Sequence, residues 1–105
     1  NQVSFLGGSS YSASKAAICG ISKTMALELA SKKIRVNCIL PGNISTPLLN
    51  NLNLSNDAIK KDEENYPLGY GTTQDVAYAT IYLLSEASKR VTGTNLKLDG
   101  GYTLK

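Results

Sequence analysis

The chain has 105 residues, of which 42% are hydrophobic and 18% charged, and its net charge is +3. These values predict a single globular domain with a modest core and exclude a disordered chain, which would need fewer apolar residues and a larger charge imbalance. The basic residues are scattered along the sequence, so we expect no nucleic-acid partner. No apolar run approaches the roughly 20 residues that span a bilayer, and no signal peptide is recognisable. We therefore expect no membrane partner and a cytoplasmic location.

Two cysteines and no histidine limit the chemistry further. Cys19 and Cys38 lack the spacing of metal ligands, and each lies within an apolar run. The simplest interpretation is two buried thiols in a reducing compartment. Without histidine, catalysis by imidazole is excluded, and no metal site is predicted.

The first half of the chain predicts a loop, a helix and a strand. Residues 1–10 are rich in Gly and Ser and read as a loop. A helix is predicted from Tyr11 to about Ser31, where proline is absent and helix-forming residues abound. Residues 34–40 form a short apolar run, typical of a buried strand in a parallel sheet, and Pro41-Gly42 ends it. A helix that leads by a short turn into a buried strand is the second half of a βαβ unit.

Two surfaces of this helix differ in side-chain size. One face carries an apolar stripe at helical spacing, formed by Ala17, Ile21, Met25 and Leu29. Gly20 and several alanines make another part of the surface small, which would allow a second helix to approach closely.

Residues 43–71 form a long connection, and a connection of this length is more often a substrate loop than a passive linker. A short helix is predicted from Asp57 to Glu64. Tyr66-Pro67 ends it, because the residue before a proline avoids the helical region. The acidic run from Asp62 to Glu64 is interpreted as a solvated charge cluster. Tyr66, Tyr70 and Tyr102 are interpreted as packing residues.

The last third of the chain predicts a helix and a strand. Thr72 and Asp75 have the spacing of a capping box, and helical periodicity continues from Thr73 to Ser88. A turn at residues 91–94 leads into a short strand at Leu96 and Leu98, closed by residues 99–101. Asn37, in the first strand, is interpreted as a buried hydrogen-bonding residue that ties the sheet to a neighbour.

Tyr11 and Lys15 are four residues apart at the start of the predicted helix, so they share one face about one turn apart. A tyrosine pKa is normally near 10, which makes tyrosine a poor base at neutral pH. A nearby ammonium group and the helix N-terminus both favour the phenolate and lower that pKa. The pair therefore has the chemistry of a general acid–base centre. Such pairs are also common on solvated helix faces, so both interpretations stay open from spacing alone.

The combination of motifs is more specific than the pair. YSASK at residues 11–15 is followed by IRVNCILPG at 34–42, by Ile44-Ser45-Thr46, and by VTGTNLKLDGGYT at 91–103. In order and spacing, these motifs resemble the C-terminal portion of a short-chain dehydrogenase/reductase, and the resemblance covers essentially the whole chain. Within that family the sequence is similar to the 3-oxoacyl-carrier-protein reductases and related small alcohol and sugar dehydrogenases.

The resemblance implies hydride transfer between NAD or NADP and a small-molecule carbonyl or alcohol substrate. It implies that Tyr11 is the catalytic acid and base, and that Lys15 binds the nicotinamide ribose and lowers the Tyr11 pKa. Cofactor contacts are implied for Tyr11, Lys15, Pro41, Gly42, Ile44 and Thr46. Residues from about Pro47 to Tyr66 would form a mobile substrate loop.

The glycine-rich dinucleotide motif, the catalytic serine and the catalytic asparagine of the family have no counterpart in this sequence. The expected fold class is therefore α/β, as a single partial domain over residues 1–105. It would be the C-terminal half of a Rossmann-type doubly wound parallel sheet that lacks the N-terminal dinucleotide-binding half. We expect the isolated chain to be an inactive fragment that needs the missing half, or copies of itself, as partner. The alternative is a non-catalytic remnant that acts as an oligomerisation or binding module.

Overall fold

The computed structural model describes residues 9–45 and 55–104, without the side chains of residues 9–12. The elements in chain order are α1 (Ser9–Leu29) with a 3-10 turn at Ala30–Lys32, β1 (Cys38–Pro41), α3 (Asn56–Glu63), α4 (Thr73–Leu84), a 3-10 turn at Glu86–Ser88, β2 (Asn95–Leu98) and a 3-10 turn at Tyr102–Leu104. This order agrees with the elements predicted from the sequence.

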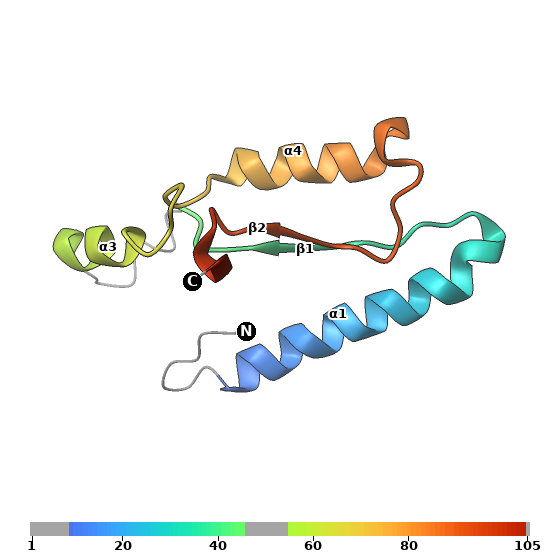
Figure 1. The fold of residues 1–105 in the computed structure, drawn as a ribbon, viewed down its shortest axis with the longest axis horizontal. Coiled ribbons are helices and arrows are strands. Elements are labelled where there is room, and N and C mark those ends of the chain that lie inside the picture. The colour runs from blue at the N-terminus through green and yellow to red at the C-terminus, as the bar shows by residue number, and fades with distance from the viewer. Residues whose placement is uncertain (1–8, 46–54, 105) are drawn as a thin grey trace.

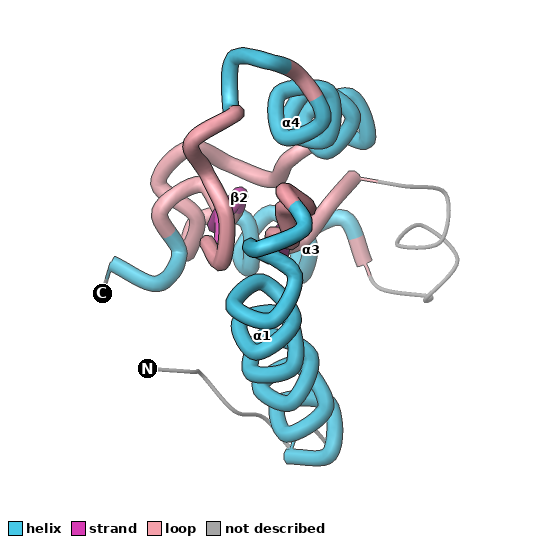
Figure 2. The backbone as a smooth tube through the Cα atoms, turned by 90° about the vertical axis from the view of Figure 1, so that its right-hand side faces the viewer, coloured by secondary structure: helices cyan, strands magenta, loops and turns pink. Residues whose placement is uncertain are grey.

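The two strands form a small parallel sheet, in which Cys38 lies opposite Asn95 and Pro41 opposite Leu98. Helices α1 and α4 lie on opposite faces of this pair, so the described part of the chain has three layers (Figures 1 and 2). A parallel strand pair between helices is consistent with the predicted partial α/β fold.

The strand prediction was wrong in its extent. Residues 34–40 were expected to be strand, but β1 begins only at Cys38. Before that residue the backbone bonds to the loop that leads into β2: Val36 N–H donates to Thr92 Oγ1 (3.1 Å), and Gly93 N–H donates to the Val36 carbonyl (2.8 Å). These bonds do not continue the register of the sheet. Among the residues of β1, Cys38 alone is buried, because the described sheet has only two strands.

Asn37 fastens the same loop by hydrogen bonds, as predicted, but it is half-buried and lies just before β1 rather than buried within the strand. Its side-chain amide donates to the Val91 carbonyl (3.0 Å), and its Oδ1 accepts from the Thr94 N–H (3.1 Å). Arg35 reinforces the contact with bonds to the carbonyls of Val91 (3.0 Å) and Leu83 (2.8 Å). Two polar side chains thus hold β1 beside the connection between α4 and β2.

Helix α4 starts as predicted and ends early. Thr72 and Asp75 form a complete capping box. The helix ends at Leu84, four residues before the predicted end, because Ser85 adopts an extended conformation. Beyond it, the fully buried Ser88 donates its hydroxyl to the carbonyls of Leu83 (3.0 Å) and Ser85 (3.1 Å) and so stabilises the turn.

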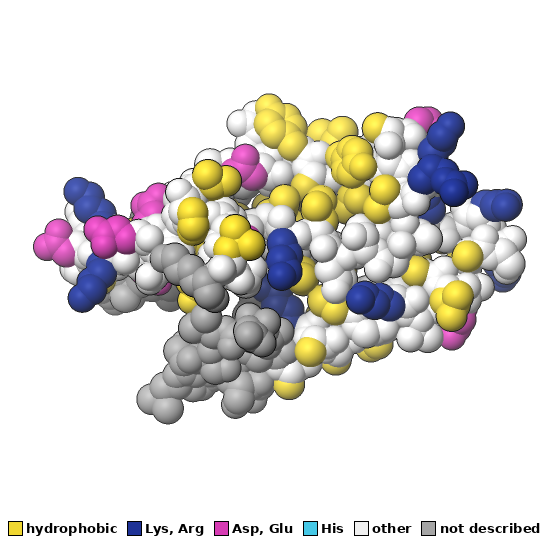
Figure 3. All heavy atoms as spheres, viewed as in Figure 1, with side chains coloured by type: hydrophobic (Ala, Val, Ile, Leu, Met, Phe, Trp, Pro, Cys, Tyr) yellow, Lys and Arg dark blue, Asp and Glu magenta, His cyan; other side chains and the backbone are white. Residues whose placement is uncertain are grey.

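Helix α1 faces the sheet with Cys19, Ser22 and Ala26, whereas Gly20 of the predicted small surface is exposed. Ala26 is buried, whereas Ile21 and Met25 of the predicted apolar stripe are 58% and 42% exposed. The sheet side of the helix also carries Cys19 and Ser22, whose side chains reach Cys38. The stripe therefore points away from the described sheet. Hydrophobic side chains are visible along α1 and over α4 in Figure 3.

In the described ranges, no helix is long and apolar enough to cross a membrane. Over the same ranges, no group of three or more acidic or cysteine side chains could hold a metal ion.

Candidate active site

The predicted catalytic pair lies on α1 at the end of the sheet where the strands finish. Figure 1 shows that α1 runs opposite to β1 and β2, so its first turns lie at the same end of the molecule as the carboxyl ends of both strands. Tyr11 is in the first turn and Lys15 follows one turn later. Lys15 is half-buried, and the Tyr11 side chain is outside the described part. In parallel α/β sheets, ligands bind at this end of the strands.

Pro41 and Gly42, which the resemblance assigns to the cofactor, end β1 at this same edge. Gly42 N–H continues the ladder by donating to the Leu98 carbonyl (3.1 Å). A Cβ at Gly42 would lie 3.0 Å from the Asp99 Cα and 3.0 Å from the Tyr66 ring. At such distances the neighbours would have to move by a few tenths of an ångström to admit a side chain. The chain's own packing therefore favours a glycine here, a reason that the sequence alone did not indicate.

Ile44 directs its own backbone N–H and C=O away from Gly71. It forms an isolated parallel bridge with Gly71. The hydrogen bonds of this bridge come from its neighbours: Gly71 N–H donates to the Asn43 carbonyl (3.0 Å), and Ser45 N–H donates to the Gly71 carbonyl (2.9 Å). In a parallel ladder the central residue then directs its own N–H and C=O to the opposite side. Such a donor and acceptor pair fits a carboxamide, which carries one acceptor oxygen and an NH₂ donor.

The three tyrosines Tyr66, Tyr70 and Tyr102 pack behind this segment, which confirms their interpretation as packing residues. The Tyr66 ring stacks on Tyr102 at a centroid distance of 4.5 Å and meets Tyr70 edge-on at 5.2 Å. This cluster joins the segment before α4 to the C-terminal turn. It also supplies the ring that limits the space at Gly42.

The interpretation of residues 62–64 as a solvated charge run was wrong for two of the three acids. Asp62 is half-buried and accepts hydrogen bonds from the Asn43 side chain (2.9 Å) and the Tyr70 hydroxyl. Glu63 accepts from the Tyr70 backbone N–H (3.2 Å). Because Asn43 lies between Gly42 and Ile44, Asp62 links α3 to the segment assigned to the cofactor.

This environment shifts the titration of Tyr70. Burial, followed by the hydrogen bond to the Asp62 carboxylate, raises the pKa of Tyr70 to about 12. Because the folded pKa lies above the usual value near 10, the protonated phenol stabilises the fold below pH 10, and this contribution is lost between about pH 10 and 12. We expect Tyr70→Phe to reduce the loss of stability in that pH range.

The same shift can be measured by the absorbance of tyrosinate during a pH titration. One of the six tyrosines should ionise near pH 12, and Asp62→Asn should move that ionisation to lower pH because the carboxylate is lost. Tyr78→Phe on the exposed face of α4 is the matched control and should leave it in place. Burial also raises the pKa of Tyr66, so the decisive signal is the ionisation near pH 12, and its persistence in Tyr70→Phe would contradict the assignment.

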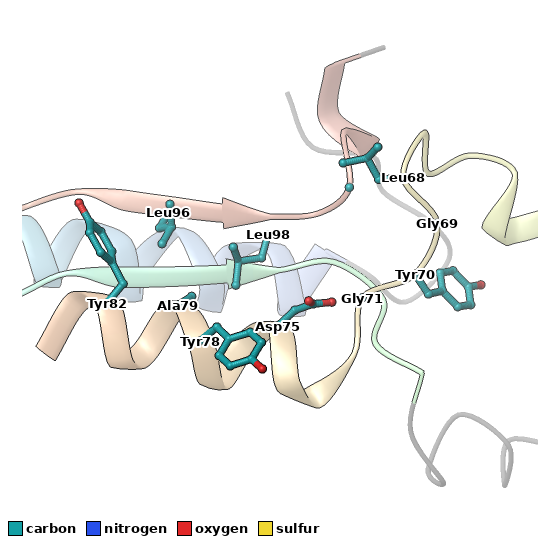
Figure 4. A pocket seen from close by; sticks show the side chains of 11 residues that line it. Leu68, Gly69, Tyr70, Gly71, Asp75, Tyr78, Ala79, Tyr82, Leu96 and Leu98 are labelled. Atoms are coloured by element: carbon teal, nitrogen blue, oxygen red, sulfur yellow. The ribbon is translucent and has the colours of Figure 1, made fainter. Parts of the chain in front are cut away.

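A groove of about 610 Å³ lies on the other face of the sheet, between α4, β2 and the segment before α4 (Figure 4). Its lining is largely apolar, with Tyr78, Tyr82, Leu96 and Leu98 among its residues. The carboxylate of Asp75 in this groove already accepts the Thr72 N–H (2.8 Å) in the capping box. The groove thus lies across the sheet from α1 and offers no acid–base pair.

Thr46, the remaining cofactor residue implied by the resemblance, lies outside the described residues. The same holds for residues 47–54 of the expected substrate loop. The described part of this loop runs from residue 55 to Tyr66 and contains α3.

The comparisons with known proteins support the family resemblance. The family model described as Enoyl-(Acyl carrier protein) reductase matches residues 1–103. The chain is 44% identical over 98 residues to 3-oxoacyl-(acyl-carrier-protein) reductase FabG of Chlamydia muridarum. The aligned residues cover 90% of this chain and 38% of that protein. It is 44% identical over 95 residues to 3beta-hydroxysteroid dehydrogenase 1 of Eggerthella lenta, with 90% and 36% covered.

Solved structures extend the agreement to the fold. A 4-hydroxyisoleucine dehydrogenase complexed with NADH has a TM-score of 0.83 at 36% identity, with 90% of this chain and 40% of that chain covered. A putative 2-deoxy-d-gluconate 3-dehydrogenase from Agrobacterium tumefaciens with bound NADP has a TM-score of 0.83 at 37% identity, with 91% and 39% covered. The chain belongs to the short-chain dehydrogenase/reductase family, and it spans about two fifths of the length of these relatives.

Proposed function

We propose that this chain supplies the acid–base part of an NAD(P)-dependent oxidoreductase that interconverts a carbonyl and an alcohol. One observation carries the proposal: α1 places Tyr11 and Lys15 at the end of the sheet where β1 finishes with Pro41 and Gly42. An acid–base pair and a backbone suited to a carboxamide are then found at one edge.

In this proposal Tyr11 transfers the proton. During reduction its hydroxyl donates a proton to the carbonyl oxygen, which would otherwise develop negative charge, and during oxidation its phenolate accepts the alcohol proton. The ammonium group of Lys15 favours the phenolate and so brings its pKa closer to neutral. Lys15 also donates hydrogen bonds to ribose hydroxyls.

Besides Tyr11 and Lys15, the cofactor contacts are assigned to Pro41, Gly42, Ile44 and Thr46. The N–H and C=O of Ile44 hold the carboxamide, and Pro41 and Gly42 flank the ring. When bound, NAD or NADP supplies or accepts the hydride. The acidic or basic residue that selects between NAD and NADP in the family has no counterpart in this sequence.

The substrate is proposed to be a small molecule enclosed by residues 43–71, which would exclude water on closing. The names of the relatives support a carbonyl or alcohol carbon as the reacting centre, whether in an acyl chain or a steroid. Two free thiols, Cys19 and Cys38, support a reducing compartment, and we place the reaction in the cytoplasm.

Because the chain spans about two fifths of its relatives, we expect the isolated chain to lack turnover. The test is a chimera in which residues 1–105 replace the matching segment of the Chlamydia muridarum reductase. We expect the chimera to oxidise NADPH or NADH in the presence of a 3-oxoacyl thioester, with an equal amount of alcohol formed. A folded chimera that binds the cofactor but gives no alcohol with any carbonyl tested would contradict the proposal.

A second function is favoured by the exposed apolar side chains of α1 and α4. Ile18 and Ile21 are 57% and 58% exposed, and Tyr78 and Ile81 are 61% and 62% exposed. Such faces suit an assembly module that acts without chemistry. A stable oligomer of the isolated chain that is indifferent to NAD and NADP would favour this function, whereas cofactor-dependent protection of the chimera favours the enzyme.

A further inference from the structure

The two cysteines, expected to be separate buried thiols, lie in contact between α1 and β1. Their sulfur atoms are 3.9 Å apart, and both thiols are free. Cys38 is 8% exposed, whereas Cys19 is only partly buried, which corrects the expectation for that residue. Ser22, one turn along α1 from Cys19, places its hydroxyl 3.6 Å from the Cys38 sulfur.

We propose that Cys19 and Cys38 form a reversible intramolecular disulfide by exchange with a low-molecular-weight disulfide such as glutathione disulfide. Cys19 is the entry point because it is the more accessible of the two. Cys38 is the resolving residue because its sulfur already lies beside that of Cys19.

The exchange balances in two steps. The Cys19 thiolate attacks one sulfur of the small disulfide, the S–S bond breaks, and the first small thiol leaves with the proton that Cys19 gave up. The Cys38 sulfur then attacks the Cys19 sulfur, the mixed disulfide breaks, and the second small thiol leaves with the Cys38 proton. The protein loses two electrons, which reduce one disulfide to two thiols.

The structure permits the bridge with a small movement. The sulfur atoms must approach from 3.9 Å to the roughly 2.05 Å of a disulfide. Small side chains are found at this contact. Among the described side chains of α1 Ala26 is the buried one, and the hydroxyl of Ser22 lies beside the Cys38 sulfur.

The surroundings of Cys19 set the rate of the first step. Burial is the main cause that raises the pKa of Cys19, and the Cys38 thiol adds to it, whereas Lys15 and Lys23 on α1 oppose it. Because the thiolate is the reactive form, the exchange should be slow at neutral pH and faster as the pH rises.

The bridge would join residues 19 and 38 covalently, and so fasten α1 to the start of β1. Closing a loop of this length restricts the unfolded chain and should raise the urea midpoint of unfolding. This expectation concerns the fold alone and does not depend on the proposed catalytic function.

The test is incubation of this chain with glutathione disulfide, followed by intact-mass measurement and peptide mapping. We expect a monomer lighter by about 2 Da, a peptide pair joined through Cys19 and Cys38, and full reversal by dithiothreitol. Cys38→Ser should instead accumulate a mixed disulfide at Cys19, and Cys19→Ser should stay reduced.

Contact in the folded state is tested by repeating the equilibrium in unfolding urea. The ratio of bridge to mixed disulfide should be at least about tenfold higher in native buffer than in urea, because folding holds the two sulfurs together. A native chain that stops at the mixed disulfide, stays fully reduced, or forms only intermolecular dimers would overturn the proposal. An equal ratio of bridge to mixed disulfide in buffer and in urea would also overturn it. For this conclusion the chimera, with Cys19 and Cys38 as its only cysteines, must give the same equal ratio.

Discussion

Replacing Tyr11 with phenylalanine lowers the turnover of the chimera by about 10²- to 10⁴-fold. This is the range that a positioned general acid contributes, and phenylalanine keeps the ring while removing the proton that is transferred. Because phenylalanine keeps the aromatic ring and Lys15 still binds the ribose, we expect the dissociation constant of the reduced cofactor to change little. The measurement is kcat, with cofactor binding followed by fluorescence.

Tyr78→Phe provides the matched control, since it makes the same chemical change on the exposed face of α4. We expect wild-type turnover from that variant. Equal turnover in Tyr11→Phe and Tyr78→Phe would contradict the role of Tyr11, whereas loss of cofactor binding in Tyr11→Phe would indicate a structural role instead.

Replacing Asn37 with alanine destabilises the chimera by about 2 kcal/mol. The substitution removes the hydrogen bond to the Val91 carbonyl and the one from the Thr94 N–H. The Thr94 N–H is then left without its acceptor. A lost hydrogen bond costs about 1 kcal/mol, and an unsatisfied buried donor costs more. The measurement is urea unfolding, with the free energy obtained from the midpoint and slope.

Asn65→Ala is the control for this change, because Asn65 is exposed near the end of α3. Exposed substitutions of this kind alter stability by less than about 0.5 kcal/mol. If Asn37→Ala and Asn65→Ala had the same midpoint, the bonds of Asn37 would not hold β1 to the loop before β2.

The order and kind of the elements followed from local signals in the sequence. The capping box at Thr72 and Asp75 marked the start of α4, and Pro41-Gly42 marked the end of β1 within one residue. These signals are local because a cap or a proline acts on its own backbone. The early end of α4 could not be predicted, since it depends on Ser88 bonding back to Leu83 and Ser85.

Contacts between distant segments were harder to predict. Periodicity identified the stripe of Ile21 and Met25, but it could not show that α1 would meet the sheet with Cys19, Ser22 and Ala26 instead. For that reason the contact between Cys19 and Cys38 was missed. Which face of a helix meets a sheet depends on tertiary packing, which periodicity alone does not specify.

The candidate site was predicted in part. The spacing of Tyr11 and Lys15 placed them on one helix, and the structure shows that helix beginning at the carboxyl end of the strands. The link from Asp62 to Asn43 was missed, because the two residues are 19 positions apart and an acidic run resembles a solvated surface. The catalytic roles themselves stay predictions.

The most direct test of the central claim follows the hydride. The chimera is supplied with NADPH or NADH carrying deuterium at the transferable position of the nicotinamide, together with a 3-oxoacyl thioester. We predict one deuterium on the new carbinol carbon, formed at a rate that falls with Tyr11→Phe. Alcohol without deuterium, or labelled alcohol formed equally fast by Tyr11→Phe, would contradict the claim that this chain contributes the acid–base centre of a nicotinamide-dependent oxidoreductase.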